Sequence, residues 1–224
     1  MVFSSFLTAE EAAVASGICR KAGAPHLLYG GYSLAERQML AVSSVDTETL
    51  KMCFPIALLK LCGGDLSAIS NRDLLGALMA TGIRRDVLGD VIVRDGKALV
   101  FVSEHIRDFL IQNVTSVGRQ NIQLIEAPLS YEIPEPRFEH LRLTIASLRL
   151  DAVVGGLVHL SREQASRLIE EKMVSVNHEP VGKKTKEIHA GDCLVVRGSG
   201  KWIIDECGDL TKKGRAILQC RKYI

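Results

Sequence analysis

The chain has 224 residues, enough to bury a substantial core in one large domain or in two to three small ones. Hydrophobic residues make up 47% of it, the usual share for a folded globular protein, and no apolar run approaches the ~18 residues that a membrane helix needs. The net charge of +2 is unevenly spread, because residues 1–136 carry −3 and residues 137–224 carry +5. The composition argues against a membrane-spanning helix and predicts a basic surface in the C-terminal part.

The cysteines and the N-terminus indicate the cellular compartment. The six cysteines form no C-x-x-C pair and no Cys/His group at zinc spacing, so we expect free thiols in a reducing cytosol. The N-terminus lacks the basic start and apolar run of a signal peptide. We therefore expect a cytoplasmic protein that needs no metal and no cofactor.

Residues 1–49 are predicted to form a mainly helical segment. Thr8 suits the N-cap of a helix with two glutamates in its first turn, and this helix is expected to run to about Lys21. The glycine pair at 30–31 predicts a turn, followed by a short helix or turn around 35–37.

Residues 50–127 show the order strand, helix, hairpin, helix, strand. The apolar run 54–61 predicts the first strand, and 71–73 can cap the first helix. Asp95-Gly96 between two apolar runs is the strongest hairpin signal in the chain, and Ser103 is expected to cap the second helix. This order predicts an α+β sandwich like that of an RNA recognition motif (RRM). Since the aromatic RNA-stacking signature of a true RRM is missing, we interpret the sheet as a scaffold rather than a binding surface.

The remaining residues divide at a cluster of prolines. Three prolines between 128 and 140 predict an extended linker, and the alternating apolar residues from Leu141 to Ile145 predict a strand that leads into a domain over 141–200. Residues 201–224 contain Lys212-Lys213-Gly214-Arg215 between two apolar runs, which predicts a basic hairpin.

The stretch from 148 to 198 carries a recognisable pattern. It opens with Arg149-Leu150-Asp151, starts a second helix at Ser161-Arg162, continues through 174–177, and ends on Gly191-Asp192 and a strand over 193–197. This order resembles the S4 domain, a small RNA-binding module. The predicted fold class is therefore α+β, with a small N-terminal helical segment, an RRM-like sandwich and a C-terminal S4 (αL-type) domain.

Two arginines in this pattern are the main candidates for RNA contacts. Ser161 and Gln164 fit a capping box, which is a structural role. Arg162 follows in the first turn, where the helix dipole disfavours a cation by roughly 0.3–1 kcal/mol, unless a phosphate lies beside it. The alternatives are a solvated Arg162 and, for Arg149, a surface ion pair with Asp151.

The other candidates are weaker. Arg167 and Lys172 either contact RNA or form pairs within their helix, and the lysines between 183 and 186 form either a solvated loop or a phosphate-facing rim. The full predicted RNA-binding set is Arg149, Ser161, Arg162, Arg167, Lys172, Asn177, Lys183, Lys184 and Lys186. The sequence contains no G-x-S-x-G, P-loop or H-E-x-x-H motif, so no catalytic residue and no small-molecule substrate is expected.

Taken whole, the chain resembles the YlmH family of S4-domain proteins. The most specific segments are 71–78, reading NRDLLGAL, and 82–90, reading GIRRDVLGD. The chain departs from the family pattern at Asn71, where His is expected, and lacks some helix ahead of Phe6. Within the S4 pattern, Lys172 and His178 replace glycines, which affects the shape of those turns.

The resemblance implies a partner and a role. Related S4 proteins bind the large ribosomal subunit and contact ribosomal RNA and a peptidyl-tRNA during rescue of stalled nascent chains, supporting non-templated C-terminal tailing. By position, Arg149 and Arg162 would carry the RNA contacts.

Three hypotheses follow from the sequence. The first, a non-catalytic binder of rRNA and tRNA on the ribosome, fits best. The second is an RNA-modifying enzyme of the pseudouridine synthase or methyltransferase type, although residues 1–136 are acidic and lack a glycine-rich cofactor loop. The third is a protein-interaction module that has lost RNA binding, for which binding would be independent of salt.

Overall fold

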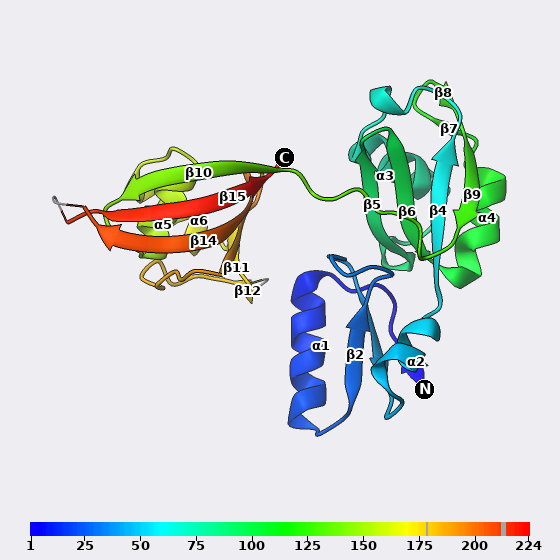
Figure 1. Ribbon diagram of the computed structural model, residues 1–224, viewed down its shortest axis with the longest axis horizontal. Coiled ribbons are helices and arrows are strands. Elements are labelled where there is room, and N and C mark those ends of the chain that lie inside the picture. The colour runs from blue at the N-terminus through cyan, green and yellow to red at the C-terminus, as the bar shows by residue number, and fades with distance from the viewer. Residues whose placement is uncertain (178, 212–213) are drawn as a thin grey trace. The chain divides into compact units, whose positions relative to one another are not determined.

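The computed structural model describes residues 1–177, 179–211 and 214–224. The chain divides into two compact units, Met1–Pro134 and Glu135–Ile224, and each contains helices and antiparallel sheet (Figure 1). The predicted α+β class is confirmed.

The first unit begins with a small segment that mixes strands and helices. Strands β1 (Val2–Phe3), β2 (His26–Tyr29) and β3 (Met39–Val42) form a sheet in the order β1-β3-β2. Helices α1 (Ala9–Lys21) and α2 (Thr47–Met52) complete it. The segment thus contains the predicted helix and, in addition, a three-stranded sheet that was not predicted. Strands β1 and β2 each pair with β3. Apolar runs as short as these do not show from sequence alone whether a segment is a strand or a buried turn.

The helix predicted from Thr8 is present with both bonds of a capping box. The Thr8 hydroxyl accepts a hydrogen bond from the N–H of Glu11 at 3.3 Å, and the Glu11 carboxylate accepts from the N–H of Thr8 at 2.7 Å. The short helix predicted as one alternative around 35–37 is not formed: residues 33–34 form a turn and residues 36–37 a bend.

The RRM-like part of the first unit has the predicted order of elements. Its elements are β4 (Ile56–Cys62), α3 (Asn71–Ala80), β5 (Leu88–Arg94), β6 (Lys97–Ser103), α4 (Arg107–Asn113) and β9 (Gln123–Ala127). Between α4 and β9 lies a small pair of strands, β7 (Ser116–Val117) and β8 (Gln120–Asn121). The sheet order is β5-β6-β4-β9, with antiparallel neighbours throughout. The two crossover connections carry α3 and α4, which gives the strand order of an RRM.

Local sequence explains the turns and ends of these elements, with one exception. The β5–β6 hairpin turns at Asp95 and Gly96, which have φ of 54° and 70°, as a tight hairpin requires. Helix α3 is capped by Ser70, one residue before the predicted 71–73, and Asp73 completes its capping box. The side-chain oxygen of Asn71 instead accepts from the N–H of Val93 at 2.6 Å. Ser103 is in the predicted cap position, as the N-cap residue of a short 3-10 helix (Glu104–Ile106) that leads directly into α4, but its hydroxyl forms no capping hydrogen bond.

Both faces of the RRM-like sheet are covered. On one face, Leu74 and Leu78 of α3 and Leu110 of α4 pack with Leu59 and Val100 of the sheet. On the other face, a second core forms between the sheet and residues outside the RRM-like part. Its fully buried members are Phe6, Met39, Ala41, Leu50, Phe54, Ile56, Leu58, Ile92, Leu99, Phe101 and Ala127. The N-terminal segment therefore supplies half of a shared core.

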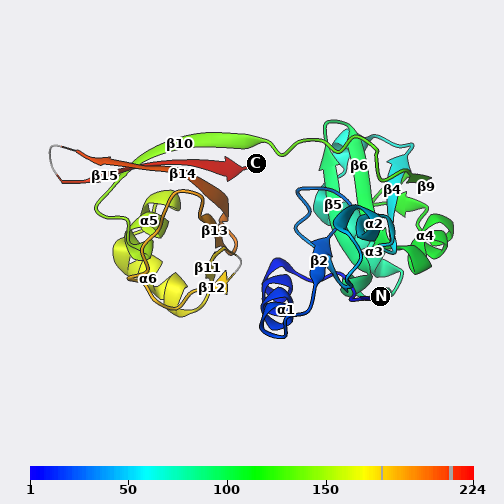
Figure 2. The same cartoon turned by 60° about the horizontal axis from the view of Figure 1, so that its bottom comes forward.

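The second unit is one six-stranded sheet with two helices on one face. Its elements are β10 (Phe138–Ile145), α5 (Leu150–Leu157), α6 (Arg162–Glu170), β11 (Val174–Val176), β12 (Glu179–Pro180), β13 (Cys193–Val196), β14 (Gly200–Leu210) and β15 (Ala216–Tyr223). The sheet order is β10-β15-β14-β13-β11-β12. Figure 2 shows α5 and α6 together on a single side of this sheet.

Two predicted boundaries in this region differ from the structure. The linker expected over 128–140 ends earlier, because β10 begins at Phe138. Residues 201–224 do form a hairpin, β14–β15, but β15 pairs with β10 along its whole length, from Phe138↔Tyr223 to Ile145↔Ala216. The hairpin is thus part of the domain's sheet and not an appendage. Lys212 and Lys213 lie outside the described residues.

Glycine allows α5 to approach the sheet closely. A Cβ on Gly156 would lie 2.8 Å from Ile145 Cγ2 of β10, closer than side chains tolerate. Trp202 lies in the core of the second unit, between the helices and the sheet, and is 1% exposed.

Candidate nucleic-acid interface

The first turns of α5 and α6 bring the two predicted arginines to one place. Helix α6 begins after Ser161, whose hydroxyl accepts from the N–H of Gln164 at 3.2 Å, as the capping box predicted. Arg162 is therefore the first residue of α6, and Arg149 is the N-cap residue of α5.

A buried carboxylate holds both arginines. Asp151 is 2% exposed, and Arg149 donates to it from Nε (3.2 Å) and Nη2 (3.0 Å). Arg162 donates to the same carboxylate from Nε (3.0 Å) and Nη2 (3.4 Å). Burial alone would raise the pKa of Asp151, but the hydrogen bonds and charges of Arg162 and Arg149 outweigh it and lower the pKa below its usual value. Asp151 is therefore an ionised anchor for two guanidinium groups.

This arrangement leaves a positive surface. The cluster of Arg149, Asp151 and Arg162 contains two cations and one anion, so one positive charge remains. The arginine side chains are 41% and 55% exposed, against 3% for the carboxylate. Since a guanidinium is planar, an arginine that turns its Nε–Nη2 edge to Asp151 directs Nη1 away from it. The exposed edges of two fixed guanidinium groups can bind a phosphate.

The loop that contains Lys183, Lys184 and Lys186 is hydrogen-bonded to the first turn of α5. The carbonyl of Lys186 accepts from the N–H of Leu150 at 2.8 Å, and the carbonyl of Lys184 accepts from the N–H of Asp151 at 3.2 Å. These bonds satisfy N–H groups of the first turn of α5, which a helix leaves unpaired. The Lys184 ammonium lies 3.3 Å from the Glu170 carboxylate at the end of α6. The loop of Lys183, Lys184 and Lys186 thus lies beside the arginine pair.

The other predicted residues are engaged within the fold. Arg167 forms an exposed ion pair of 2.7 Å with Glu163 on α6, the intrahelical pair that was the alternative for it. Asn177 donates to Asp192 at 2.7 Å and accepts from the N–H of Cys193 at 2.8 Å, so its side chain closes a turn between strands.

Lys172 occupies the position of an expected glycine and keeps the backbone conformation of one. Its φ is 56°, in the left-handed region that favours glycine. Its side chain is exposed just after α6. The turn therefore retains its shape despite the substitution. His178, the other departure from the glycine pattern, lies outside the described residues.

Sequence reasoning missed the central role of Asp151. Its partnership with Arg149 was anticipated as a surface pair, but the carboxylate is buried and shared with Arg162. The signal was the apolar context: Leu150, Val153 and Val154 surround Asp151 in sequence and are core residues. A carboxylate among them requires a charged partner.

In the first unit, the sheet face that an RRM uses for RNA is occupied by the protein itself. The ring of Tyr32 stacks on Phe101 of β6, with centroids 5.0 Å apart and planes at 15°. The hydroxyl of Tyr32 donates to Asp90 at 2.8 Å, and the backbone N–H groups of Glu36 and Arg37 donate to the same carboxylate. Burial, with the charge of Asp90 and the hydrogen bond to it, raises the Tyr32 pKa above its usual value.

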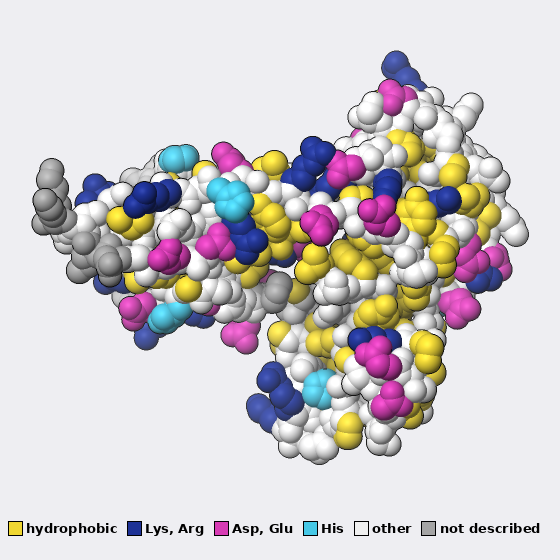
Figure 3. Space-filling model, viewed as in Figure 1, with side chains coloured by type: hydrophobic (Ala, Val, Ile, Leu, Met, Phe, Trp, Pro, Cys, Tyr) yellow, Lys and Arg dark blue, Asp and Glu magenta, His cyan; other side chains and the backbone are white. Residues whose placement is uncertain are grey.

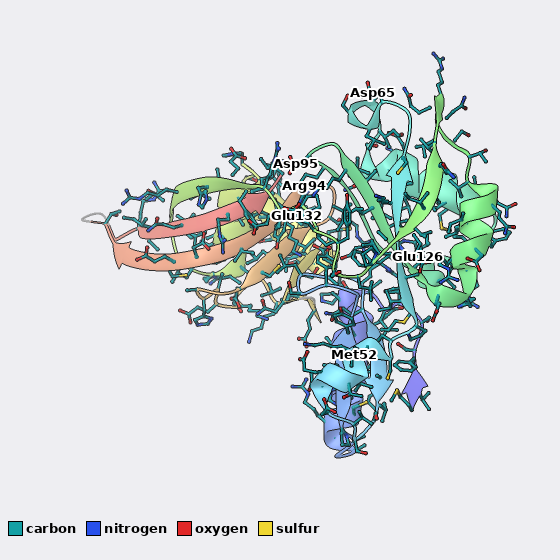
Figure 4. All side chains as sticks on the ribbon, turned by 45° about the vertical axis from the view of Figure 1, so that its right-hand side comes forward. Met52, Asp65, Arg94, Asp95, Glu126 and Glu132 are labelled. Carbon is teal, nitrogen blue, oxygen red and sulfur yellow. The ribbon has the colours of Figure 1, made fainter. Side chains whose placement is uncertain are left out.

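The chain after β9 covers the other end of this face. Tyr131 lies with the ammonium groups of Lys60 and Lys97 at 5.3 and 5.4 Å from its ring centre, and Lys97 forms an ion pair of 2.8 Å with Glu132. Figure 4 labels Glu132 close to Arg94 at this end of the sheet. The chain's own residues therefore contact this face of the sheet at both ends.

The described residues show neither a metal-binding group nor a membrane-spanning helix. Among the described residues, no three His, Cys, Asp or Glu side chains lie close enough together to hold a metal ion. All six cysteines are free thiols. No helix in the described ranges has both the length and the apolar character needed to cross a membrane.

Comparison with known proteins identifies the class of the RRM-like part. Residues 54–131 match the family model described as the putative RNA-binding domain in YlmH. These residues run from the end of the N-terminal segment, through all four strands of the sheet, to Tyr131.

The whole chain is similar to YlmH proteins. It is 28% identical over 217 residues to the ribosome-associated protein quality control protein P2 of Bacillus subtilis (strain 168), which covers 96% of this chain and 84% of that protein. The solved structure of cell division protein ylmH from Streptococcus pneumoniae matches with a TM-score of 0.51 and 15% identity, over 59% of this chain and 82% of that one. The resemblance to the YlmH family is thus confirmed, and the structural match shows a shared fold.

Proposed function

We propose that this chain is a non-catalytic RNA-binding protein that acts on the ribosome. The description of its matched domain as a putative RNA-binding domain and the name of its Bacillus relative support an RNA-binding role. The observation that carries the proposal is the cluster in which Asp151 holds Arg149 and Arg162 at the starts of two helices.

The proposed contact is electrostatic and made from one surface. Arg149 and Arg162 bind backbone phosphates through their exposed edges, and Lys183, Lys184 and Lys186 extend the positive rim. Arg167 on α6 and Lys172 just after it are further candidates. Ser161 and Asn177 act indirectly, since their side chains are used to shape the helix start and the turn.

We assign residues 141–200 to the S4 type and propose rRNA and tRNA of the large ribosomal subunit as the targets, in rescue of stalled translation. The support is the succession α5, α6, β11 with the capping box at Ser161, together with the likeness to the Bacillus protein over most of the chain. A cytoplasmic location follows from this proposal, because ribosomes are there.

Sedimentation of the tagged chain from a lysate tests the proposal. Wild type is compared with Arg149→Ala/Arg162→Ala in sucrose gradients at low and high salt, and the RNA that co-purifies is sequenced. We expect wild type in the large-subunit fraction at low salt, and its release by high salt or by the double substitution.

The control is Arg20→Ala/Lys21→Ala, which removes the same charge from the exposed end of α1. This variant should sediment as wild type does. Wild type at the top of the gradient without RNA, or equal release of the control, would contradict the proposal.

A further inference from the structure

The outer face of the second unit's sheet carries aromatic side chains that its core does not use. Phe138 of β10 and Tyr223 of β15 are directly paired across the strands, with ring centroids 4.8 Å apart and planes at 64°. Helices α5 and α6 and the core lie on the other face, with Trp202 and Leu218 among the core residues. The two rings therefore form a separate apolar spot on the face without helices.

Cations lie over both rings. The guanidinium carbon of Arg221 is 4.9 Å from the centre of the Phe138 ring, and the ammonium of Lys201 is 4.6 Å from the centre of the Tyr223 ring. Register places all four residues on one face, since Tyr223 pairs with Phe138 and Lys201 precedes the Trp202↔Lys222 pair by one residue. Figure 3, which views this face, shows hydrophobic, basic and histidine side chains next to one another on it.

A polar hollow continues the same face along β10. Its volume is about 350 Å³, and its lining residues are His140, Leu141, Arg142, Asp205, Glu206, Gln219 and Cys220. Outward side chains of a strand follow one another at about 6.7 Å, so His140 and Arg142 are the next two steps after Phe138. The two carboxylates of the hollow are already partnered: Asp205 accepts from Arg221 at 2.8 Å and Glu206 from Gln219.

We propose that this face binds a single-stranded RNA segment. Proteins that hold unpaired strands combine aromatic rings, on which bases stack, with basic residues that follow the backbone. Phe138 and Tyr223 supply the rings, and Lys201, Arg221 and Arg142 supply cations beside them. With Asp205 and Glu206 counted, the face keeps a positive charge, which suits a phosphate chain. The donors and acceptors of the hollow lie where they can contact a base edge.

This site is distinct from the arginine cluster. Arg149 and Arg162 belong to α5 and α6, which pack on the opposite face of the sheet. The unit would therefore hold a structured RNA on its helix side and an unpaired strand on its open side.

The test measures binding of a fluorescein-labelled oligouridylate to the full chain by fluorescence polarisation. Phe138→Leu/Tyr223→Leu keeps apolar strand residues but removes the rings, and it should weaken binding about tenfold or more, because each stacked base contributes substantially. Phe138→Tyr/Tyr223→Phe keeps both rings and should bind as wild type does. Arg20→Ala/Lys21→Ala, which removes two cations from the exposed end of α1, should also retain this binding.

Three results would overturn the proposal: no binding by wild type, undiminished binding by the leucine variant, or an equal loss of binding in the Arg20→Ala/Lys21→Ala control. The first would leave the face to a protein partner. If the leucine variant fails to fold, as judged from the fluorescence of Trp202, ultraviolet crosslinking of wild type to the oligouridylate decides. Crosslinks at Phe138 or Tyr223 support the site, and crosslinks confined to other residues refute it.

Discussion

Tyr32 lies flat on Phe101, 5.0 Å from ring centre to ring centre and within 15° of parallel. Phe101 is on β6, the third strand of an RRM-like sheet, and its ring is fully buried. In an RRM, aromatic residues on the sheet stack on RNA bases. Here the chain's own tyrosine takes that position, and the bond from its hydroxyl to Asp90 fixes it there.

Phe101→Leu distinguishes a scaffold from a binding face. Loss of the stacked ring from a full core should lower the free energy of unfolding of the first unit by roughly 1–3 kcal/mol. We expect no change in large-subunit co-sedimentation, since the ring is covered. Urea unfolding followed by circular dichroism and the sucrose gradient measure the two effects. A folded variant that has lost ribosome binding would show that the N-terminal segment opens and exposes this face.

Asp151→Asn removes the charge that holds the two arginines. The fold of the second unit should be destabilised by about 1–3 kcal/mol, because the guanidinium groups lose a charged acceptor but are exposed enough to be hydrated. RNA binding should weaken although neither arginine is changed. The chain's single tryptophan, Trp202, is in this core, so its fluorescence in urea reports the unfolding of the second unit alone.

The matched control for that variant is Asp108→Asn. It breaks the exposed pair with Arg107, in which the carboxylate is 70% exposed, and should cost less than about 1 kcal/mol with no effect on RNA. Equal RNA affinity of Asp151→Asn and wild type would remove Asp151 from its positioning role.

Acid should weaken the second unit through the same carboxylate. The pKa of Asp151 is lowered in the folded chain, whereas an unfolded aspartate has a pKa of about 3.9. The ion pairs therefore stabilise the fold above about pH 4, and this stabilisation is lost as pH falls through the folded pKa. We expect the difference in urea midpoint between wild type and Asp151→Asn to shrink from neutral pH to pH values below about 4. A constant difference would contradict the ionised anchor.

Lys172→Gly should stabilise the second unit. Lysine at φ 56° is strained by roughly 1–2 kcal/mol, and glycine relieves this at a partly offsetting cost in chain entropy. We expect a net gain of about 0.5–1 kcal/mol in the Trp202 unfolding assay. Lys183→Gly in the exposed loop is the control and should give no gain. Destabilisation by Lys172→Gly would mean that the lysine side chain contributes to the fold.

Local patterns predicted much of this fold. The capping boxes at Thr8 and Ser161 and the Asp95-Gly96 turn depend on residues within a few positions of one another, so the sequence alone reveals them. Strand β2 and the full extent of β10 depend on pairing with distant strands, and the sequence does not display those partners. The cap at Ser103 was predicted at the right position, but its hydroxyl forms no capping bond, and the residue is buried at the end of β6.

In the candidate site, too, local features could be predicted from the sequence and contacts between distant segments could not. The sequence pattern placed Arg149 and Arg162 at the starts of two helices, and the family resemblance made them the main candidates for RNA contacts. The pattern did not reveal that one carboxylate is shared between them, because that depends on how α5 and α6 pack. The aromatic pair of Phe138 and Tyr223 is separated by 85 positions in sequence, and only the antiparallel register joins it.

That register also brings residues from the two ends of the second unit together. Phe138 and Tyr223 face each other on neighbouring strands, and the N–H of Ile224 donates to the carbonyl of Arg137 at 3.2 Å. The first and last residues of the unit therefore lie next to each other at one end of the sheet. A module with adjoining ends can be excised, grafted into the loop of a host protein, or circularly permuted without a long tether. We therefore expect that the unit from Glu135 to Ile224 can be transferred as one piece, and that a reporter fused after Ile224 would lie beside the first residues of the unit.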